Sequence, residues 1–474
     1  MLPEKKKNVF VHPYIPNSVP EVKAQMLSEI GVSDIEELYE GIPEELRFRG
    51  NLNLPPPLLS EQALRSHVEQ ILSGNTTTAE YLSFLGGGCY RHYVPAICDE
   101  IVTRSEFLTA YAGEPYEDHG RFQALFEFES LMAELLDMDV VSVPTYDWCQ
   151  AASTALRMAG RITGRKGALV ADTVSPDRLS SMRNYCRSAM SIDMISHDPE
   201  TGLIDIRDLK SKISSHIGCV YFENPTYLGF TETQGTMISD IAHSHGALSL
   251  VGADPTSLGV IVPPDHYGAD IVCGDIQGLG VHMNFGGGHG GFLASRDEKE
   301  FVMEYPFRLF GITKTSCEGE WGFGDVAYER TSFAQREEGK EFVGTMAALW
   351  GIAAGVYLSL LGPNGMRELG KSIMQKSQYA AKQLSKIDGV KAPLFNSPHF
   401  KEFVVDFNDT GLTVEEINKC LLRHGIFGGK DLSEEFPPLG SCALYCVTEV
   451  HTKDDIDRLA SSLRKCVEGG RIHA

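Results

Sequence analysis

Three short segments of the chain carry hydroxyl, amide or carboxylate groups at places where α/β proteins often bind small ligands. The first is Thr145-Tyr146-Asp147, which directly precedes an expected helix at 149–162. The free N–H groups and the dipole at the start of a helix favour an anion such as a phosphate. A capping turn is the commoner reason for a Thr or an Asp at such a position. This segment alone therefore leaves both interpretations open.

The other two segments follow apolar, strand-like runs. Asn224 lies in Glu223-Asn-Pro-Thr-Tyr227, and Asp254 ends Leu248-Ser-Leu-Val-Gly-Ala-Asp254. Ligands bind at the carboxyl ends of strands in open α/β sheets. A carboxylate at Asp254 could pair with the protonated ring nitrogen of pyridoxal phosphate (PLP) and keep that cofactor an electron sink. An ordinary strand exit at Asn224 and a helix cap at Asp254 are the alternatives.

The elements that would position these residues alternate along the chain. Apolar, β-rich runs lie at 167–171, 190–195, 219–222, 247–251 and 271–273, separated by helical stretches such as 149–162, 204–214 and 237–245. Such alternation is typical of right-handed βαβ units and a mainly parallel sheet. A compact α+β domain is indicated later by strands at 403–407 and 444–447 and helices at 414–424 and 453–467.

We therefore predict an α/β protein with three parts: a helical arm at 1–75, a large domain at 76–330, and a linking apolar helix with a small domain at 331–474. The uncharged stretch 346–361 is almost long enough for a membrane span. Its Ala and Gly content, and Gly362-Pro363 directly after it, favour instead a buried helix that ends there.

Composition and net charge indicate which binding partners and which cellular compartment to expect. A formal net charge of −22 argues against nucleic acid and anionic lipid as partners. Lys5, Lys6 and Lys7 are not followed by an apolar run, so neither a signal peptide nor a membrane anchor is expected. The 11 cysteines include no C-x-x-C, and Cys442 and Cys446 have no nearby His or Cys. We expect reduced thiols, no metal site and a cytoplasmic protein.

The order of these elements resembles the PLP-dependent transferases of the aspartate-aminotransferase fold (fold type I), and this resemblance exposes a gap. In that superfamily the Schiff-base lysine follows the aspartate by about two dozen residues, just after a Gly-Ala-Asp segment. Here Gly268-Ala-Asp270 is present, but Gly278 stands at the matching distance from Asp254. Lys314 lies too far along and is better interpreted as an exposed loop lysine. Because covalent PLP chemistry needs a lysine amine, the chain is not expected to perform it alone.

A longer resemblance covers nearly the whole chain. It runs through Phe84-Leu-Gly-Gly-Gly-Cys-Tyr-Arg-His-Tyr-Val-Pro95, Arg104–Tyr111, Gln123–Phe128, Asp254–Gly259 and Phe427–Leu432. These segments resemble the N-terminal half, or separate subunit 1, of the glycine cleavage system P-protein. The resemblance implies a lysine-less subunit of glycine decarboxylase that pairs with a homologous subunit 2, two of each. That partner would bind PLP covalently, and the aminomethyl group of glycine would pass to the lipoyl arm of the carrier (H) protein.

The resemblance also implies which residues form the site. Catalytic roles are expected for Tyr90, His92 and Tyr93, with His92 as the group that transfers a proton. The mouth or wall of the partner's PLP pocket is expected to include Thr109, Tyr111 and Gln123. A vestigial cofactor cradle, without a lysine at Gly278, would consist of Thr145, Tyr146, Asp147, Asn224 and Asp254. Ordinary half-buried packing is the alternative for the tyrosines and the histidine.

Some positions depart from the family's usual pattern close to this site. Trp148 stands where a glycine is common, and its ring would partly fill a phosphate pocket. The segments Ala112–Gly120, Ile276–Gly280 and Arg336–Glu341 also differ. Two alternatives therefore stay open: a divergent paralogue that acts on another amino acid, and a non-catalytic scaffold or regulatory partner of a PLP enzyme.

Overall fold

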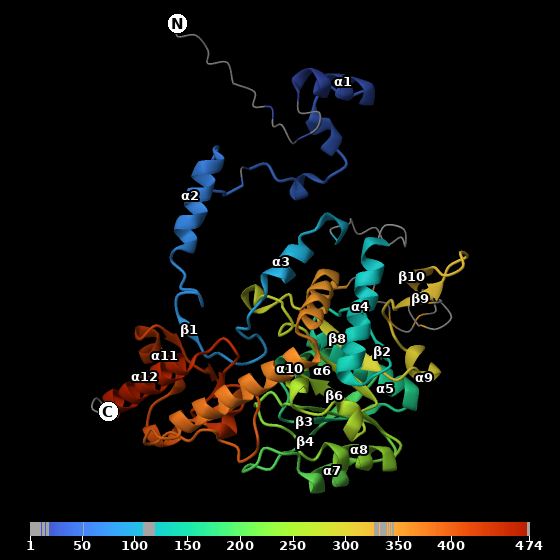
Figure 1. Ribbon diagram of the computed structural model, residues 1–474. Coiled ribbons are helices and arrows are strands. Elements are labelled where there is room, and N and C mark those ends of the chain that lie inside the picture. Colours follow the sequence, from blue (N-terminus) through green and yellow to red (C-terminus); the bar gives the residue numbers. More distant parts are fainter. Residues whose placement is uncertain are drawn as a thin grey trace. The chain divides into compact units, whose positions relative to one another are not determined.

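The computed structural model describes residues 11, 15, 19–50, 52–107, 119–326, 331, 339, 341, 343 and 346–471. Backbone contacts divide the chain into two compact units, residues 1–75 and 76–474 (Figure 1). The first unit contains helices α1 (Pro20–Ile30) and α2 (Glu61–Leu72) and short 3-10 turns at Ile35–Tyr39 and Glu44–Leu46. None of its described residues is buried. This unit therefore has no hydrophobic core among the residues that the structure describes.

A seven-stranded sheet, in the order β2-β8-β7-β6-β5-β3-β4, forms the centre of the second unit. Its strands are β2 (Val140–Val141), β3 (Gly167–Ala171), β4 (Ser191–Ile195), β5 (Ile217–Glu223), β6 (Leu248–Ala253), β7 (Ile271–Asp275) and β8 (Gly291–Ser295). The five strands from β4 to β7 in this order are parallel, whereas β8 pairs antiparallel with both of its neighbours, β7 and β2. The predicted mainly parallel sheet is confirmed.

Helices precede, connect and follow the strands of this sheet (Figure 1). They are α3 (Ala96–Val102), α4 (His119–Leu136), α5 (Trp148–Thr163), α6 (Pro176–Cys186), α7 (Ile206–Lys212), α8 (Gly235–Ser244) and α9 (Lys299–Val302). Short 3-10 turns lie at Ser105–Phe107, Pro255–Gly259, Pro264–Tyr267 and Asn284–Gly286. Helix α5 contacts β3, β5, β6, β7 and β8. Its buried face includes Ala151, Ala152, Ala155 and Ala159, whose small side chains permit this close packing.

An antiparallel hairpin of β9 (Phe310–Lys314) and β10 (Trp321–Asp325) was not predicted from the sequence. Lys314 ends β9, is exposed, and has its Nζ 5.7 Å from the centroid of the Trp321 ring. The expectation that Lys314 is exposed is confirmed. The expectation that it lies in a loop is wrong, because its backbone pairs with that of Trp321.

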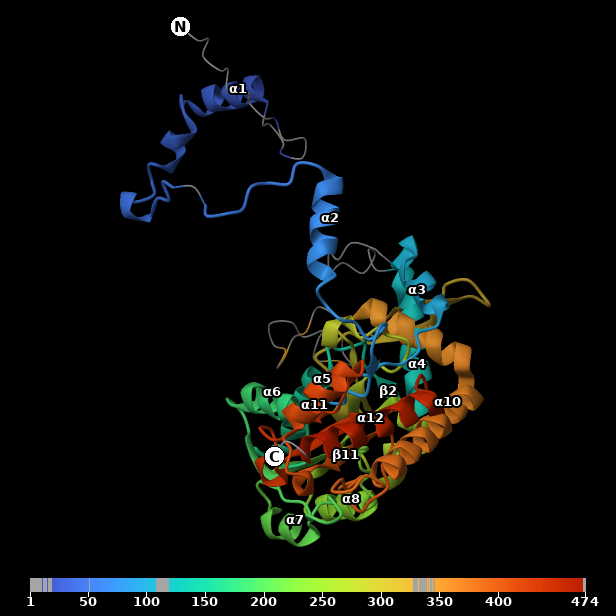
Figure 2. The same ribbon diagram turned by 90° about the vertical axis from the view of Figure 1, so that its left-hand side faces the viewer.

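Helix α10 (Ala348–Leu384) connects the sheet region to the C-terminal region. It contacts α3 and α4, and also α12 (Lys453–Arg471) and β11 (Glu402–Asp406), as can be followed in Figure 2. The buried helix predicted at 346–361 is confirmed. Its predicted end at Gly362 is only a break, since Gly362 has φ 58° and ψ −175° and a new helical stretch begins at Pro363.

Among the described helices, none combines the length and the apolar character that a membrane crossing requires.

The C-terminal region contains a three-stranded antiparallel sheet in the order β11-β14-β13. Its further elements are β13 (Lys430–Asp431), β14 (Cys442–Cys446), α11 (Val414–Arg423), α12, and 3-10 turns at Asn408–Thr410 and Pro437–Leu439. Strand β1 (Leu82–Ser83) pairs in parallel with β12 (Ile426–Phe427), which brings the segment after β1 to this region. The boundary between the large and the small domain near residue 330 stays a prediction.

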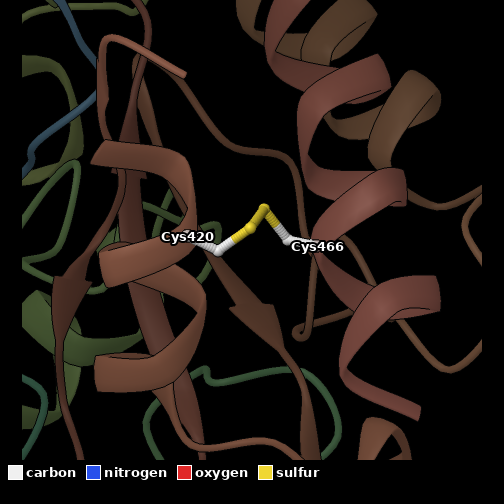
Figure 3. The surroundings of a disulfide bond; sticks show 2 residues. All are labelled: Cys420 and Cys466. Atoms are coloured by element: carbon white, nitrogen blue, oxygen red, sulfur yellow. A yellow bond between two sulfur atoms is a disulfide. The ribbon is translucent and has the colours of Figure 1, made fainter. Parts of the chain in front are cut away.

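A disulfide joins Cys420 of α11 to Cys466 of α12 (Figure 3). The expectation that all cysteines are reduced thiols is therefore wrong for this pair. The two residues are 46 positions apart in the sequence, so only the packing of α11 on α12 brings them together.

Candidate functional site

The segment that follows β1 is held against the C-terminal sheet by Glu402. One carboxylate oxygen of Glu402 accepts a hydrogen bond from the N–H of Gly87 at 2.7 Å. The other accepts one from the hydroxyl of Tyr90 at 2.8 Å. A Cβ at Gly86 would lie 2.6 Å from Glu402, and one at Gly87 would lie 2.8 Å from Lys430. A Cβ at Gly86 would also lie 2.9 Å from Cγ of the buried Leu444, and Gly87 has φ +100°, a left-handed conformation that favours glycine.

Tyr90 is fixed on three sides. Its N–H donates to Oε1 of Gln277 at 3.2 Å, and Nε2 of Gln277 donates to its carbonyl at 2.9 Å. The Nζ of Lys401 lies 3.6 Å from the centroid of its ring, within the range of a cation–π contact. Burial, together with the charge of Glu402, raises the pKa of Tyr90 well above its usual value. Tyr90 is therefore a neutral donor that anchors Glu402.

Lys401 and Asp254 form a buried ion pair at the carboxyl end of β6. The Nζ of Lys401 lies 2.7 Å from Oδ2 of Asp254. The other oxygen of Asp254 accepts from the N–H and the hydroxyl of Thr256, at 3.0 and 2.7 Å. Burial alone would raise the pKa of Asp254, but Lys401 and Thr256 outweigh it, so that pKa is lowered. Asp254 therefore caps a turn and carries a charge that Lys401 neutralises.

His92 lies beside this ion pair with its side chain fully buried. Its Nδ1 is 2.8 Å from Oε2 of Glu449, and because a carboxylate only accepts, Nδ1 must carry a hydrogen. Its Nε2 is 3.4 Å from Nζ of Lys401. An ammonium group only donates, so this contact is a hydrogen bond only in the tautomer with its hydrogen on Nδ1. Both ring nitrogens thus face charged groups of the same chain.

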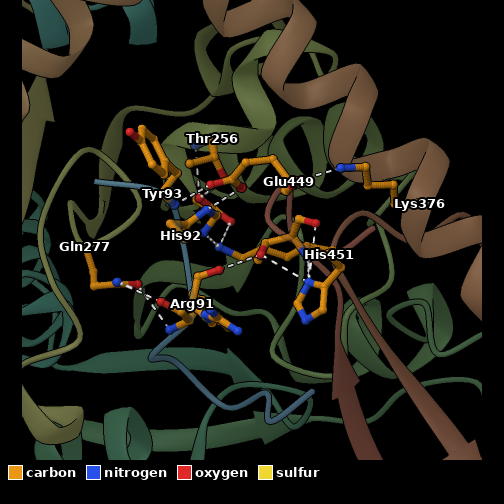
Figure 4. Close-up of polar contacts among 12 residues, drawn as sticks. Arg91, His92, Tyr93, Thr256, Gln277, Lys376, Glu449 and His451 are labelled. Carbon is orange, nitrogen blue, oxygen red and sulfur yellow. Dashed lines mark hydrogen bonds and ion pairs between the residues drawn. The ribbon is translucent and has the colours of Figure 1, made fainter. Parts of the chain in front are cut away.

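Glu449 positions two neighbouring residues at once (Figure 4). It holds His92 with one oxygen and accepts from the N–H of Tyr93 with the other, at 2.7 Å. Burial alone would raise the pKa of Glu449, but the interactions with His92 and the N–H of Tyr93 lower it to about 2. The Tyr93 side chain is 64% exposed and points away from His92 (Figure 4). Tyr93 is therefore presented outward from a rigid base.

Gly278, at the position where the resemblance led us to expect a missing Schiff-base lysine, has no space for a side chain. A Cβ there would lie 2.7 Å from Cγ2 of Thr256 and 3.4 Å from Nε2 of His92. Contacts below 3.0 Å require a shift of the surrounding atoms, and Thr256 is buried.

The end of the cradle where a phosphate would be expected is also occupied by side chains. Arg178 makes two hydrogen bonds to Glu223, at 2.6 and 2.7 Å, and its guanidinium carbon lies 3.9 Å from the centroid of the Trp148 ring. The indole N–H of Trp148 donates to the hydroxyl of Tyr221 at 3.2 Å. Trp148, whose ring was expected to fill part of a phosphate pocket, lines the small space that remains there.

The other cradle residues form local contacts. Asp147 caps α5 by accepting from the N–H of Gln150 at 2.7 Å. The hydroxyl of Thr145 donates to the carbonyl of Asp147, and the exposed Tyr146 binds the Gln150 side chain through its N–H. Asn224 is buried, and its amide makes hydrogen bonds to the backbone of Glu232 and to the hydroxyl of Tyr267.

These side chains do not fit PLP. The cavity that they leave has a volume of about 20 Å³, which is room for about one water molecule. It is lined by Tyr90, Trp148, Arg178, Pro225, Thr226, Tyr227, Gly229, Asp254, Phe400, Lys401 and Glu402. We call this set of residues, with His92 and Gly278, the closed cradle. It contains neither the space nor the lysine that covalent PLP binding requires.

The structure thus brings together only some of the residues that the sequence suggested. Tyr90, His92, Asp254 and Gly278 meet in the closed cradle. Gln123 lies exposed on α4, where its amide donates to Glu127 at 2.8 Å. Thr109 and Tyr111 lie outside the described residues.

The sequence did not predict three residues of the closed cradle, Arg178, Lys401 and Glu402, or their partners Glu223 and Glu449. One feature of the sequence could have indicated buried, paired charges. Lys401 and Glu402 are two charged residues at the start of the apolar run 403–405. Charged side chains in such a place are buried only when they are paired.

Comparison with known proteins agrees with this geometry. The family model for the glycine cleavage system P-protein matches residues 12–463. The chain belongs to this P-protein family. It is similar to a protein named "Probable glycine dehydrogenase (decarboxylating) subunit 1" from Staphylothermus marinus, with 39% identity over 461 residues, 95% of this chain and 97% of the relative. A protein of the same name from Saccharolobus islandicus is 38% identical over 465 residues, 97% of this chain and 99% of the relative.

Solved structures support the same family and fold. A crystal structure of glycine decarboxylase (P-protein) of the glycine cleavage system, in an inhibitor-bound form, superposes with a TM-score of 0.83 at 31% identity. The match covers 96% of this chain and 100% of that one. A sphingosine-1-phosphate lyase of Burkholderia pseudomallei shares the fold, with a TM-score of 0.63 at 14% identity, over 90% of this chain and 94% of the lyase. The predicted fold type I architecture is confirmed.

Proposed function

We propose that this chain is the lysine-less subunit 1 of a glycine decarboxylase, an oxidoreductase of the glycine cleavage system. The relatives that match it over nearly their full length are named as subunit 1 of that enzyme. The observation that carries the proposal is the closed cradle, in which Gly278 replaces a lysine and Lys401 neutralises Asp254. A P-protein chain with such a cradle needs a second subunit to supply the cofactor.

PLP is then bound by a homologous subunit 2, with two copies of each subunit in the complex. The lipoyl arm of the carrier (H) protein receives the aminomethyl group. The complex acts in the cytoplasm, and neither nucleic acid nor a membrane is a partner. The family resemblance supports the roles of subunit 2 and of the carrier protein. The net charge of −22 argues against nucleic acid and anionic lipid as partners.

The part of this chain in the reaction is to position residues at the partner's pocket. Of the three predicted catalytic residues, Tyr93 is the exposed one. Its N–H donates a hydrogen bond to Glu449. His92 and Tyr90 lie behind it and act as positioning residues through Glu449 and Glu402. Thr109, Tyr111 and Gln123 stay proposed as residues that line the mouth or wall of that pocket.

A groove between α3, α4 and α10 suits the partner subunit. It encloses about 250 Å³ between α3, α4 and α10 and is lined by Ile97, Ile101, Phe107, Ala124, Glu127, Ile352, Gly355, Val356 and Ser359. Ile97 is 43% exposed, so its apolar side chain is available for contact with a partner. Obligate subunit interfaces are large and apolar, and this groove lies directly after the segment that presents Tyr93.

The test is reconstitution. The chain is co-expressed with a homologous, lysine-containing subunit from the same genome, and exchange of labelled bicarbonate into the carboxyl group of glycine is measured with a lipoylated carrier protein. We expect exchange by the pair and none by this chain alone. Full exchange by the partner alone would identify a scaffold or regulatory subunit. Exchange only with another amino acid would identify a divergent paralogue.

A further inference from the structure

Three side chains with affinity for soft metal ions meet between α11 and α12, outside the closed cradle. Cys420 lies on α11, His424 directly follows that helix, and Cys466 lies on α12. Their sulfur and imidazole nitrogen atoms all lie within 4.8 Å of one another. The sequence contains 64 Asp and Glu residues, yet among the described residues this is the only group of three or more possible ligands that meet so closely.

The helix positions explain why these residues meet. Cys420 and His424 are four positions apart, so they lie on the same face at the end of α11. The carbonyl of His424 accepts a hydrogen bond from Arg458 of α12 at 2.6 Å, which holds the end of α11 against α12. Cys466 is buried on the facing side, whereas Cys420 and His424 are half-buried. The cluster is thus built by two helices and is open to solvent on one side.

The chemistry of the three ligands selects a particular class of ion. Two thiolates and an imidazole form the kind of donor set that binds zinc, with Zn–S distances of about 2.3 Å and Zn–N distances of about 2.0 Å. Tetrahedral bonds of that length place the ligand atoms roughly 3.5 to 4 Å apart, within the 4.8 Å span found here. Because one side is open, a water molecule can supply the fourth ligand. Hard cations prefer oxygen ligands, and this cluster contains none.

We propose that Cys420, His424 and Cys466 form a two-state site, which is the observed disulfide when oxidised and a binding site for one zinc-class ion when reduced. A dithiol reductant gives two electrons and two protons to the Cys420–Cys466 bond and becomes a disulfide itself, leaving two thiols on the chain. The divalent ion then binds both sulfurs and the imidazole and releases the two thiol protons to the solvent. Either state joins α11 to α12, and only the reduced, metal-free chain lacks this link.

The test uses Co²⁺ as a spectroscopic probe on the full chain. The protein is reduced with a phosphine, separated from the reductant without oxygen, and titrated with Co²⁺. We expect one equivalent to bind with the intense visible bands of tetrahedral cobalt and with thiolate-to-cobalt charge transfer, and Zn²⁺ to displace it. The oxidised chain should bind none. The reduced chain should melt several degrees lower with a chelator than with Zn²⁺.

Variants separate this site from other thiols. Cys420→Ser, Cys466→Ser and His424→Gln should each weaken binding at least tenfold. Cys317→Ser, which changes an exposed cysteine outside the cluster, should leave binding unchanged. If the serine variants fold poorly, His424→Gln still decides the matter, because it keeps both cysteines. The proposal is overturned if the reduced chain binds no stoichiometric cobalt, or if Cys317→Ser weakens binding as much as His424→Gln does.

Discussion

Lys401 gives the buried carboxylate of Asp254 a cationic partner from within the same chain. Burial alone would lower the pKa of Lys401, but Asp254 and the other acidic groups nearby outweigh burial, so that its pKa is raised and the side chain stays charged. A charged lysine is a poor nucleophile. Lys401 is thus a structural cation, although it is the lysine that lies in the cradle.

Substitution of Lys401 tests this role. Lys401→Met leaves Asp254 buried without its counter-charge, and breaking such a pair costs about 3 to 5 kcal/mol. We expect a loss of that size in the free energy of unfolding, measured by urea denaturation. The double variant Lys401→Met/Asp254→Asn should lose clearly less than the sum of the two single variants. A loss below about 1 kcal/mol in the single variant would show that the pair contributes little.

Glu402 makes the stability depend on pH. Its burial, only partly opposed by Lys401, raises its pKa from 4.5 to about 7. A carboxyl group with a raised pKa in the folded state stabilises the fold below its ordinary pKa, and this contribution is lost as the pH rises through about 7. Between pH 5 and pH 8 the free energy of unfolding should therefore fall by up to roughly 3 kcal/mol more for the unchanged protein than for the Glu402→Gln variant. Equal pH profiles of the two proteins in urea denaturation would contradict this explanation.

The sequence identified only half of this cluster, for a physical reason. Tyr90, His92 and Asp254 lie in segments whose residue types already suggested a site. Glu402 is 312 positions from Tyr90, and Glu449 is 357 positions from His92. Pairing over such separations follows from how the C-terminal sheet packs on the segment after β1, and local patterns carry no information about it.

Helix α10 shows that a Gly-Pro pair can predict a break in a helix without predicting where the helix ends. The sequence Gly362-Pro363 does interrupt the helical dihedral angles. Proline, however, is also favoured in the first turn of a helix, so the same pair that ends one stretch starts the next. The outcome depends on whether the following residues have a surface to pack on, and here α12 and β11 provide one.

Gly362→Ala tests this break. At φ 58° and ψ −175° the backbone lies in a region that is essentially restricted to glycine, so we expect a loss of about 1 to 3 kcal/mol. A Cβ at this position would meet no other atom within 4 Å, so the loss reports on the backbone alone. Thermal unfolding is a suitable measurement.

Gly469→Ala is the matched control. Gly469 lies in α12, and a Cβ there also meets nothing within 4 Å. Alanine in a helix should stabilise it by up to about 1 kcal/mol. If both variants change stability in the same direction, the break at Gly362 is not a constraint on the backbone.

The parallel strands of the sheet were easier to predict than its antiparallel pairings. Strands β3 and β5 are buried along their whole length and therefore appear as unbroken apolar runs. The short edge strand β2, its neighbour β8 and the hairpin of β9 and β10 were not predicted. An antiparallel edge strand depends on its partner more than on its own composition, so its own sequence does not predict it well.

At the scale of the whole molecule, the groove between α3, α4 and α10 is where we expect the partner subunit. Ile97→Asp places a charge in this groove and should weaken the complex with subunit 2 at least tenfold, as measured by size-exclusion chromatography with light scattering on co-expressed subunits. The free chain should keep its stability, because Ile97 is partly exposed.

Met237→Asp is the matched control for this substitution. Met237 is 49% exposed on α8, away from the groove. This variant should bind subunit 2 as the unchanged chain does. Equal binding by Ile97→Asp and Met237→Asp would place the interface elsewhere.

The filled space around Gly278 has a consequence for the history of this chain. A mutation that placed a lysine at this position would meet Thr256 and His92, and it would not open the space that Lys401 and Trp148 fill. Each reversal made first would destabilise the fold before any cofactor could compensate for it. Several mutations would be needed before this subunit could bind PLP, and each would be unfavourable when made first. The order of mutations therefore opposes such a change.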